Sequence, residues 1–181
     1  MRKQNLKDYK LPKNWSRGRN IFFEMLWQVF FKSLISSSLP GTIWRRYILI
    51  LFGAKLGKCL RLSPGIKIKM PWRLIVGDFS WIGEDVWIDN LSMVKIGNNV
   101  CISQGVYFCT GNHDFNKVNF NLICKSIIID SESWIGSKVV IGPGIKIGTG
   151  SVIKMGSIIT EDVPPQSIYK GNKTIKNYFV K

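Results

Sequence analysis

The sequence predicts a mainly β fold, a solenoid of three-sided coils with a short α-helical extension at its N-terminus. Three observations lead to this prediction. A bulky apolar residue recurs every six positions, small or turn-forming residues stand beside it, and two apolar runs precede the repeat. The chain has 181 residues, of which 45% are hydrophobic and only 20% charged, as is typical of a globular domain.

The first unit, residues 1–58, begins with a polar, basic leader of about 20 residues. Two apolar and aromatic runs follow at 21–31 and 43–52, separated by Pro40-Gly41. Each run is shorter than the roughly 20 residues that cross a bilayer as a helix, so we expect two short helices. They either cap an open end of the solenoid or lie in a membrane interface, and the sequence leaves both alternatives open.

The second unit, residues 59–163, carries the repeat. Ten of its twelve anchor positions are Ile, in a chain with 25 Ile in total. Helices repeat every 3.6 residues and strands every two, whereas one inward anchor per six residues describes one side of a triangular coil, with about 18 residues per turn. The anchors form three sets with a spacing of six: Val76, Ile82 and Ile88; Ile96, Ile102 and Phe108; and Ile129, Ile135, Ile141, Ile147, Ile153 and Ile159.

The residues beside the anchors complete the pattern of a coil. The position after an anchor is usually small or turn-forming, as at Gly136, and we expect Gly at corners because it tolerates positive φ. The fourth position is small or β-branched, as at Ser133 and Val139, which suits a second, slimmer side chain inside the coil. Stacked coils would bury these side chains in one continuous core.

The repeat changes phase twice. From Ile88 to Ile96 there are eight residues, and from Phe108 to Ile129 there are 21, which we interpret as one turn of 18 plus three. Insertions in a solenoid leave the coil as loops, where functional groups concentrate. The larger break, a loop at about 109–128, contains the only His of the chain, His113; the smaller contains Asp89 and Asn90.

Over about residues 59–172 the chain resembles the hexapeptide-repeat acyltransferases, which fold as left-handed parallel β-helices. The motifs that carry this resemblance are Thr110-Gly111-Asn112-His113-Asp114, Trp134-Ile135-Gly136-Ser137, Ile141-Gly142-Pro143-Gly144 and Glu161-Asp162-Val163-Pro164-Pro165. The apolar N-terminal extension and Ile102-Ser103-Gln104-Gly105 are more particularly similar to the colanic-acid-type exopolysaccharide acetyltransferases. The resemblance implies transfer of acetyl from acetyl-CoA to a sugar hydroxyl in polysaccharide or glycolipid biosynthesis, without a metal.

The resemblance also implies roles for individual residues. His113 would be the general base, for which a neutral imidazole with an unperturbed pKa of about 6.5 is well suited. Asp114 either orients the ring or is a solvated loop acid. Asn90 would bind the acceptor, although Asp89 could take that position across the two-residue insertion.

The donor would bind in a groove between neighbouring coils of a homotrimer. Trp134 would line its acetyl end, the backbone N–H of Ser137 would face the thioester, and Met155 and Thr160 would follow the pantetheine arm. In the C-terminal tail, residues 164–181, Lys173 and Lys176 would meet the CoA phosphates. The Pro-Ala pair that many relatives have after Gly-Asn is missing here, since Gly171-Asn172 runs directly into Lys173.

Composition restricts the partners. The net charge is +15, from 26 Lys and Arg against 11 Asp and Glu, and such a balance attracts anions. No nucleic-acid-binding signature accompanies it, so we do not expect nucleic acid. Four Cys without a CxxC pair and one His do not predict a zinc site. No cleavable signal peptide is visible, and we expect a cytoplasmic protein, or one peripheral on the inner face of the cytoplasmic membrane.

Two other functions are compatible with this sequence. One is a non-catalytic β-helix that serves as a scaffold or binding module, against which the intact loop around His113 argues. The other is an acyltransferase with a different acyl donor. Turnover of labelled acetyl-CoA with a panel of glycans discriminates among them.

Overall fold

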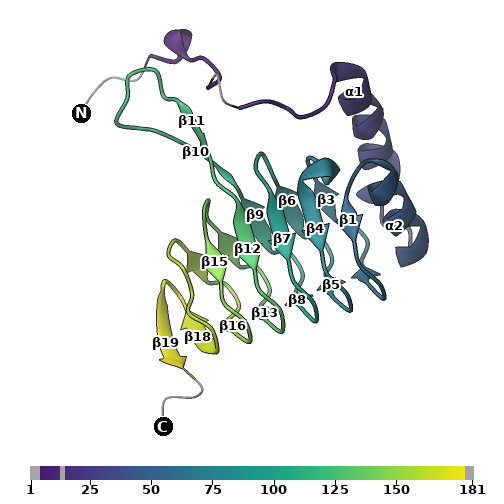
Figure 1. Cartoon of the computed structure of the whole chain (residues 1–181), viewed down its shortest axis with the longest axis vertical. Coiled ribbons are helices and arrows are strands. Elements are labelled where there is room, and N and C mark those ends of the chain that lie inside the picture. The colour runs from purple at the N-terminus through teal and green to yellow at the C-terminus, as the bar shows by residue number, and fades with distance from the viewer. Residues whose placement is uncertain (1–4, 13–14, 178–181) are drawn as a thin grey trace.

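The computed structural model describes residues 5–12 and 15–177. Figure 1 shows one elongated coil, with helices α1 and α2 stacked at the end where β1 lies and a hairpin leaving its side. The strands are short because each one forms a single side of a coil turn. The predicted mainly β solenoid with a short helical extension is confirmed.

Three sheets form the sides of the coil, and their strands are parallel apart from the last one, β19. Sheet A contains β1 (Lys55–Leu56), β4 (Leu74–Val76), β7 (Val94–Ile96), β12 (Ile127–Ile129) and β15 (Lys146–Ile147). Sheet B contains β2 (Arg61–Leu62), β5 (Trp81–Ile82), β8 (Cys101–Ile102), β13 (Trp134–Ile135), β16 (Val152–Ile153), β18 (Ser167–Lys170) and β19 (Lys173–Asn177). Sheet C contains β3 (Lys67–Ile68), β6 (Trp87–Asp89), β9 (Tyr107–Cys109), β14 (Val140–Ile141) and β17 (Ile158–Ile159).

The core is the stack of anchor side chains. All twelve predicted anchors are buried, and they lie in register across the sheets, as Val76, Ile96 and Ile129 do in sheet A. The slim residues four positions after them are buried too, with Ser92 as the exception because it falls in the smaller break. The period of six is therefore the period of the core.

The turns of the coil differ in length, and a two-residue extension precedes the one that the sequence shows between Ile88 and Ile96. In the first turns Trp81 pairs with Arg61 and with Cys101, whereas in a later turn Trp134 pairs with Val152. The first turns are therefore longer than the later one by two positions. The extra positions lie between sheets C and A, and the first such extension includes the 3-10 turn η3 (Pro71–Arg73). The coil itself begins at Lys55, ahead of the expected boundary at 59.

Close packing between turns explains the glycines that follow the anchors. The prediction that these glycines have positive φ is wrong, because positive φ occurs at another position of the repeat. Positive φ falls on the third residue after an anchor, often a non-Gly residue such as Asp85 (φ 53°) or Lys138 (φ 58°). Gly136, directly after its anchor, has no positive φ, but a Cβ there would lie 2.6 Å from the backbone N of Met155 on the next turn. Real Cβ atoms do not approach so closely, so the corner needs Gly.

The N-terminal helices cap the first turn. After the 3-10 turn η1 (Leu6–Asp8), α1 (Ile21–Phe30) is capped by Asn20, whose side chain accepts a hydrogen bond from the N–H of Phe23 at 2.9 Å. A π-helical turn η2 (Phe31–Ile35) and α2 (Thr42–Leu51) follow. Trp27 on α1 is fully buried and donates its indole N–H to the carbonyls of Ile68 and Lys69. Within the described part of the chain, no helix has the length and apolar character needed to span a bilayer.

The connection between the helices is built around a buried cation, Arg45. Its guanidinium donates to the carbonyls of Gly41 (2.8 Å), Ser37 (2.9 Å) and Leu39, and it lies over the ring of Trp44. Burial lowers the pKa of Arg45. Bonds to several carbonyls compensate this buried charge and fix the turn between α1 and α2.

Candidate active site

The larger break of the repeat is a hairpin that projects from the coil between β9 and β12. Its strands β10 (Gly111–His113) and β11 (Leu122–Cys124) are antiparallel, with His113 opposite Leu122. In sheet C, Tyr107 before the hairpin pairs directly with Val140 after it, just as Val140 pairs with Ile158 one turn later. No additional turn of the coil lies within the break, so its interpretation as a turn plus three residues is wrong. The whole insertion leaves the coil at one corner.

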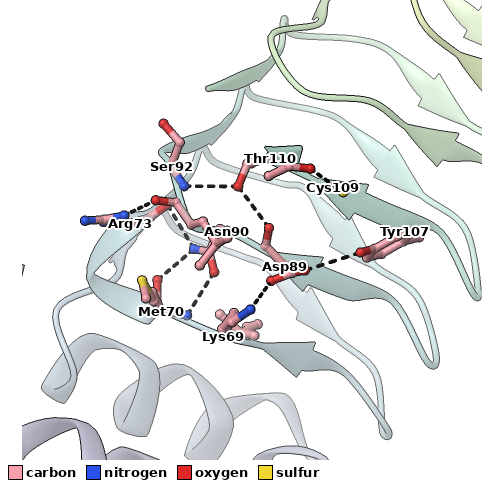
Figure 2. A network of polar contacts seen from close by, with 12 residues as sticks. Lys69, Met70, Arg73, Asp89, Asn90, Ser92, Tyr107, Cys109 and Thr110 are labelled. Atoms are coloured by element: carbon pink, nitrogen blue, oxygen red, sulfur yellow. Dashed lines mark hydrogen bonds and ion pairs between the residues drawn. The ribbon is translucent and has the colours of Figure 1, made fainter. Parts of the chain in front are cut away.

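Thr110 ties the base of this hairpin to the smaller break (Figure 2). Its hydroxyl donates to the carbonyl of Asp89 at 2.9 Å and accepts from the N–H of Ser92 at 3.0 Å. Thr110 is fully buried, and its own N–H also donates to the carbonyl of Asp89. The two breaks, which are separate in the sequence, therefore meet in space.

The carboxylate of Asp89 is engaged within the chain (Figure 2). It lies 2.8 Å from the ammonium nitrogen of Lys69 and accepts a hydrogen bond from the hydroxyl of Tyr107 at 3.3 Å. Burial raises the pKa of Tyr107, and its neighbours Cys109 and Asp89 raise it further, so this hydroxyl stays a donor at neutral pH. A part for Asp89 in acceptor binding stays a prediction.

The side chain of Asn90 is engaged within the coil. Its side chain is fully buried; the amide oxygen accepts from the N–H of Met70, and the amide nitrogen donates to the carbonyls of Met70 and Arg73. Figure 2 shows it pointing into the preceding turn. We therefore assign Asn90 to fixing the extension that contains η3 and remove it from the candidate acceptor site, because its polar atoms are already satisfied.

His113 is half-buried and held in one orientation. Its Nδ1 lies 2.8 Å from the carbonyl oxygen of Phe120, and its ring stacks on the ring of Phe120 at a centroid distance of 4.3 Å. Because a carbonyl only accepts, Nδ1 carries the proton in the neutral ring, and the lone pair is on Nε2. This is the tautomer that a general base requires, with a fixed ring and a basic nitrogen on its other edge.

Asp114 is part of the turn at the hairpin tip. Its carboxylate accepts from the N–H of Asn116 and pairs with Lys117 at 3.5 Å. Orientation of the His113 ring, one of the two roles considered for Asp114, is supplied instead by the carbonyl of Phe120. The sequence could not show this, because any residue can supply a backbone carbonyl.

The N-terminal leader lies across the hairpin, a contact that the sequence did not predict. The ring of Tyr9 is 5.8 Å from that of His113, and the N–H of Asn5 donates to the carbonyl of Val118. Further along, the indole of Trp15 donates to the carbonyl of Leu91. A cavity of about 550 Å³ lies between Pro12, Trp15 and Ser16 of the leader and Leu122–Cys124 of the hairpin, with Arg73 and residues 91–93 completing its wall.

A second concave site lies at the corner between sheets B and C. It is a groove of about 390 Å³ that brings together three predicted donor-binding residues, Trp134, Ser137 and Met155. Trp134 is exposed, and its indole N–H donates to the hydroxyl of Ser103 at 3.0 Å. Sequence reasoning missed Ser103, Gln104 and Lys154, which also line the groove. Lys154 directly follows an anchor, where most turns have a small or turn-forming residue, and that departure was a usable signal.

The remaining predicted donor residues lie outside this groove. Thr160 follows β17 and is exposed. Lys173 is exposed on β19, at the edge of sheet B, which also contains β13 and β16 of the groove. Lys176 is on the same strand, but its side chain is outside the described residues. Contacts of these three residues with CoA stay predictions.

The hairpin and the groove do not face each other within one chain. The hairpin leaves the corner between sheets C and A, whereas the groove lies between sheets B and C. Figure 1 shows the hairpin on one side of the coil, with β8, β13 and β16 toward the other. Among the described residues, no three or more His, Cys, Asp or Glu side chains gather in a group that could hold a metal ion.

Comparisons of sequence and structure with known proteins identify the family of this chain. The chain is 34% identical over 174 residues to the protein named "Putative colanic acid biosynthesis acetyltransferase WcaF" of Escherichia coli K12, covering 95% of this chain and 94% of that protein. The chain belongs to the hexapeptide-repeat acetyltransferases. A crystal structure of a member of this family from Vibrio cholerae superposes with a TM-score of 0.78 at 26% identity, covering 87% of this chain and 93% of that one.

The galactoside O-acetyltransferase of E. coli K12 is a further relative, 29% identical over 166 residues, which are 89% of this chain and 76% of that protein. The V. cholerae hexapeptide-repeat acetyltransferase has also been solved with acetyl-CoA; that structure matches with a TM-score of 0.77 at 25% identity and covers 86% of this chain and 85% of that one. No protein-family model matches the chain.

Proposed function

We propose that this protein is an acetyl-CoA-dependent O-acetyltransferase that acetylates a sugar hydroxyl in polysaccharide or glycolipid biosynthesis. The observation that carries the proposal is the bond from Nδ1 of His113 to the carbonyl of Phe120, which leaves Nε2 as the base. Support for the donor and acceptor classes comes from the acetyl-CoA complex of the V. cholerae protein and from the names of the E. coli relatives.

In the proposed mechanism, Nε2 of His113 takes the proton of the attacking sugar hydroxyl. The sugar oxygen forms a bond to the thioester carbon, and the backbone N–H of Ser137 stabilises the negative charge that develops on the carbonyl oxygen. The C–S bond then breaks, and the imidazolium returns its proton to the departing thiolate. The products are the acetylated sugar and free CoA.

We infer that the groove around Trp134 binds the acetyl and pantetheine end of the donor. Trp134 offers an exposed ring, and Met155, 73% exposed, offers an apolar edge. From there sheet B continues through β16 and β18 to β19, so Lys173 lies in the direction in which the CoA phosphates would extend. Lys154 adds a cation within the groove itself.

A complete site requires a second copy of the chain, because hairpin and groove lie at different corners. The outward faces of sheets B and C are suited to bind one. They carry exposed Trp81, Trp134, Trp87 and Ile158 beside the cations Arg61 and Lys67 of the first turn. On the outward face of sheet A, by contrast, lysines alternate with isoleucines, in the order Lys55, Ile75, Lys95, Ile128 and Lys146. Burial of two adjacent apolar sides in a cyclic assembly agrees with a homotrimer. We propose that His113 of one protomer acts at the groove of its neighbour.

We further infer a cytoplasmic location, since four free thiols suit a reducing compartment. The acceptor would be a glycan, including one carried on a membrane lipid. Contact with such an acceptor would make the enzyme peripheral to the inner face of the cytoplasmic membrane.

The test is release of CoA from acetyl-CoA in the presence of a panel of glycan acceptors. Wild-type protein should turn over with at least one acceptor, and His113→Ala should be slower by at least about a hundredfold, the usual scale for losing a general base. Val118→Ala, in the same hairpin, is the matched control and should keep its activity. Near-normal turnover of the His113→Ala protein would remove His113 from the mechanism. Faster turnover with succinyl-CoA than with acetyl-CoA would mean that the acyl donor is not acetyl-CoA.

A further inference from the structure

Helices α1 and α2 expose apolar side chains on the faces that point away from the coil. The spacing along each helix places them on one face. On α1 they are Ile21, Phe22, Met25, Leu26 and Val29, and on α2 they are Ile43, Tyr47, Ile50 and Leu51. Phe22 is 79% exposed and Ile43 73% exposed. Such faces are costly to leave in water.

The opposite faces of the same helices are already occupied. Trp27 of α1 and Leu49 of α2 are fully buried against the end of the coil, together with Phe52. Both helices are therefore apolar on nearly all sides. A helix of that kind is normally buried on all sides, in a protein core or in contact with lipid. Capping of the coil accounts for the inner faces only.

The charged residues of this N-terminal segment are almost all basic. Between residues 17 and 58 the only acid is Glu24, which is buried and paired with Arg17 at 2.7 Å. Arg45 is bonded inside the interhelical turn and is not available at the surface. The exposed cations are Arg17, Arg19, Lys32, Lys55 and Lys58.

We propose that the outward faces of α1 and α2 dock on the surface of an anionic lipid bilayer. Their apolar side chains would enter the boundary between headgroups and acyl chains, and the flanking Lys and Arg would pair with lipid phosphates. Aromatic residues such as Phe22 and Tyr47 suit that boundary. The complementary charge favours this occupant over a second copy of the chain, which would bring the same cations face to face.

The position of the helices places the docking surface at one end of the coil. They stack on the first turn, and the hairpin lies farther along the coil (Figure 1). In a cyclic assembly built through sheets B and C, the helices of every protomer lie at the same end, so several weak contacts would act together. Docking in this orientation would hold the active site at a fixed height above a lipid-linked acceptor, an inference that rests on the proposed function.

Flotation with lipid vesicles tests the proposal. The full-length protein should float with vesicles of phosphatidylcholine containing about one third phosphatidylglycerol, less with pure phosphatidylcholine, and less at high salt. Phe22→Glu should reduce the bound fraction by at least about tenfold, because it removes one buried aromatic and adds an anion. Ile175→Glu, on β19 at the opposite end of the coil, makes the same charge change and should float like the wild type.

The other possible results of flotation, light scattering and turnover count against docking or against the proposed enzyme. If wild type and Phe22→Glu float equally, or neither floats at low salt, docking through α1 is wrong. If light scattering shows a concentration-dependent doubling of mass that Phe22→Glu abolishes, the occupant is a second copy and the proposal is overturned. Turnover of a soluble glycan should be equal in wild type and Phe22→Glu. A wild type that turns over but does not float therefore contradicts docking alone, and flotation without turnover contradicts the proposed enzyme alone.

Discussion

The coil and the hairpin that carries His113 are held together by different kinds of contacts. In the coil, the anchors repeat the same environment on every turn, and each buried side chain stacks on an equivalent one. In the hairpin, individual contacts fix each residue. Thr110 bonds to Asp89, His113 bonds to Phe120 within the hairpin, and the ring of Tyr9 lies beside that of His113. The coil thus supplies a rigid scaffold by repetition, and the site depends on a few individual contacts.

This comparison predicts that the largest effect on stability comes from a change that forces two turns apart. At Gly148 a Cβ would meet the backbone N of Pro165 and lie 2.7 Å from its Cα. Gly148→Ala should therefore lower the free energy of unfolding by about 3 kcal/mol, as other overpacked cores do. Denaturant unfolding measures this value.

Gly142→Ala is the matched control, because the nearest atom to its Cβ, the carbonyl oxygen of Ile159, is 3.1 Å away. Its loss should be smaller, about 1 kcal/mol or less. Equal losses for the two substitutions would show that close packing between turns is not what keeps Gly at the corners.

In the hairpin, a smaller change in stability should have a larger effect on catalysis. Thr110→Val keeps the shape of the side chain but leaves the N–H of Ser92 without its acceptor, a loss of about 1–3 kcal/mol. Because the hairpin base would loosen, turnover should fall by about tenfold or more. Thr149→Val, at an exposed position of the coil, should change neither quantity. A Thr110→Val protein with normal turnover would mean that the tie to the smaller break does not position His113.

The same contrast explains what the sequence could and could not predict. A repeat is visible in a sequence because one physical requirement, an anchor that fills the coil, recurs at every turn, so the solenoid and all twelve buried anchors were predictable. The two-residue extension between Ile68 and Val76 was missed because it precedes Val76, the first anchor of the regular pattern. His113 could be singled out as a candidate base because it is a unique residue within a break.

The contacts of His113 could not be predicted from a local sequence pattern. The carbonyl of Phe120 has no signature in the sequence, and Tyr9 lies far from His113 along the chain. Asn90 is of a residue type that is common in binding sites, but its amide bonds to Met70 on the preceding turn of the coil. In the groove around Trp134, Ser137 and Met155 come from the same turn and the next one, and the structure brings these three residues together. Their contact with the donor stays a prediction.

Complementation of two inactive variants tests whether the hairpin of one protomer acts at the groove of another. His113→Ala and Trp134→Asp should each be nearly inactive alone, since one lacks the base and the other places a carboxylate in the groove. Co-expressed in equal amounts, they should form mixed assemblies in which about a quarter of the sites combine an intact His113 with an intact groove, and turnover should recover to about a quarter of the wild-type rate. Mixed assemblies that stay as inactive as either variant alone would contradict a shared site.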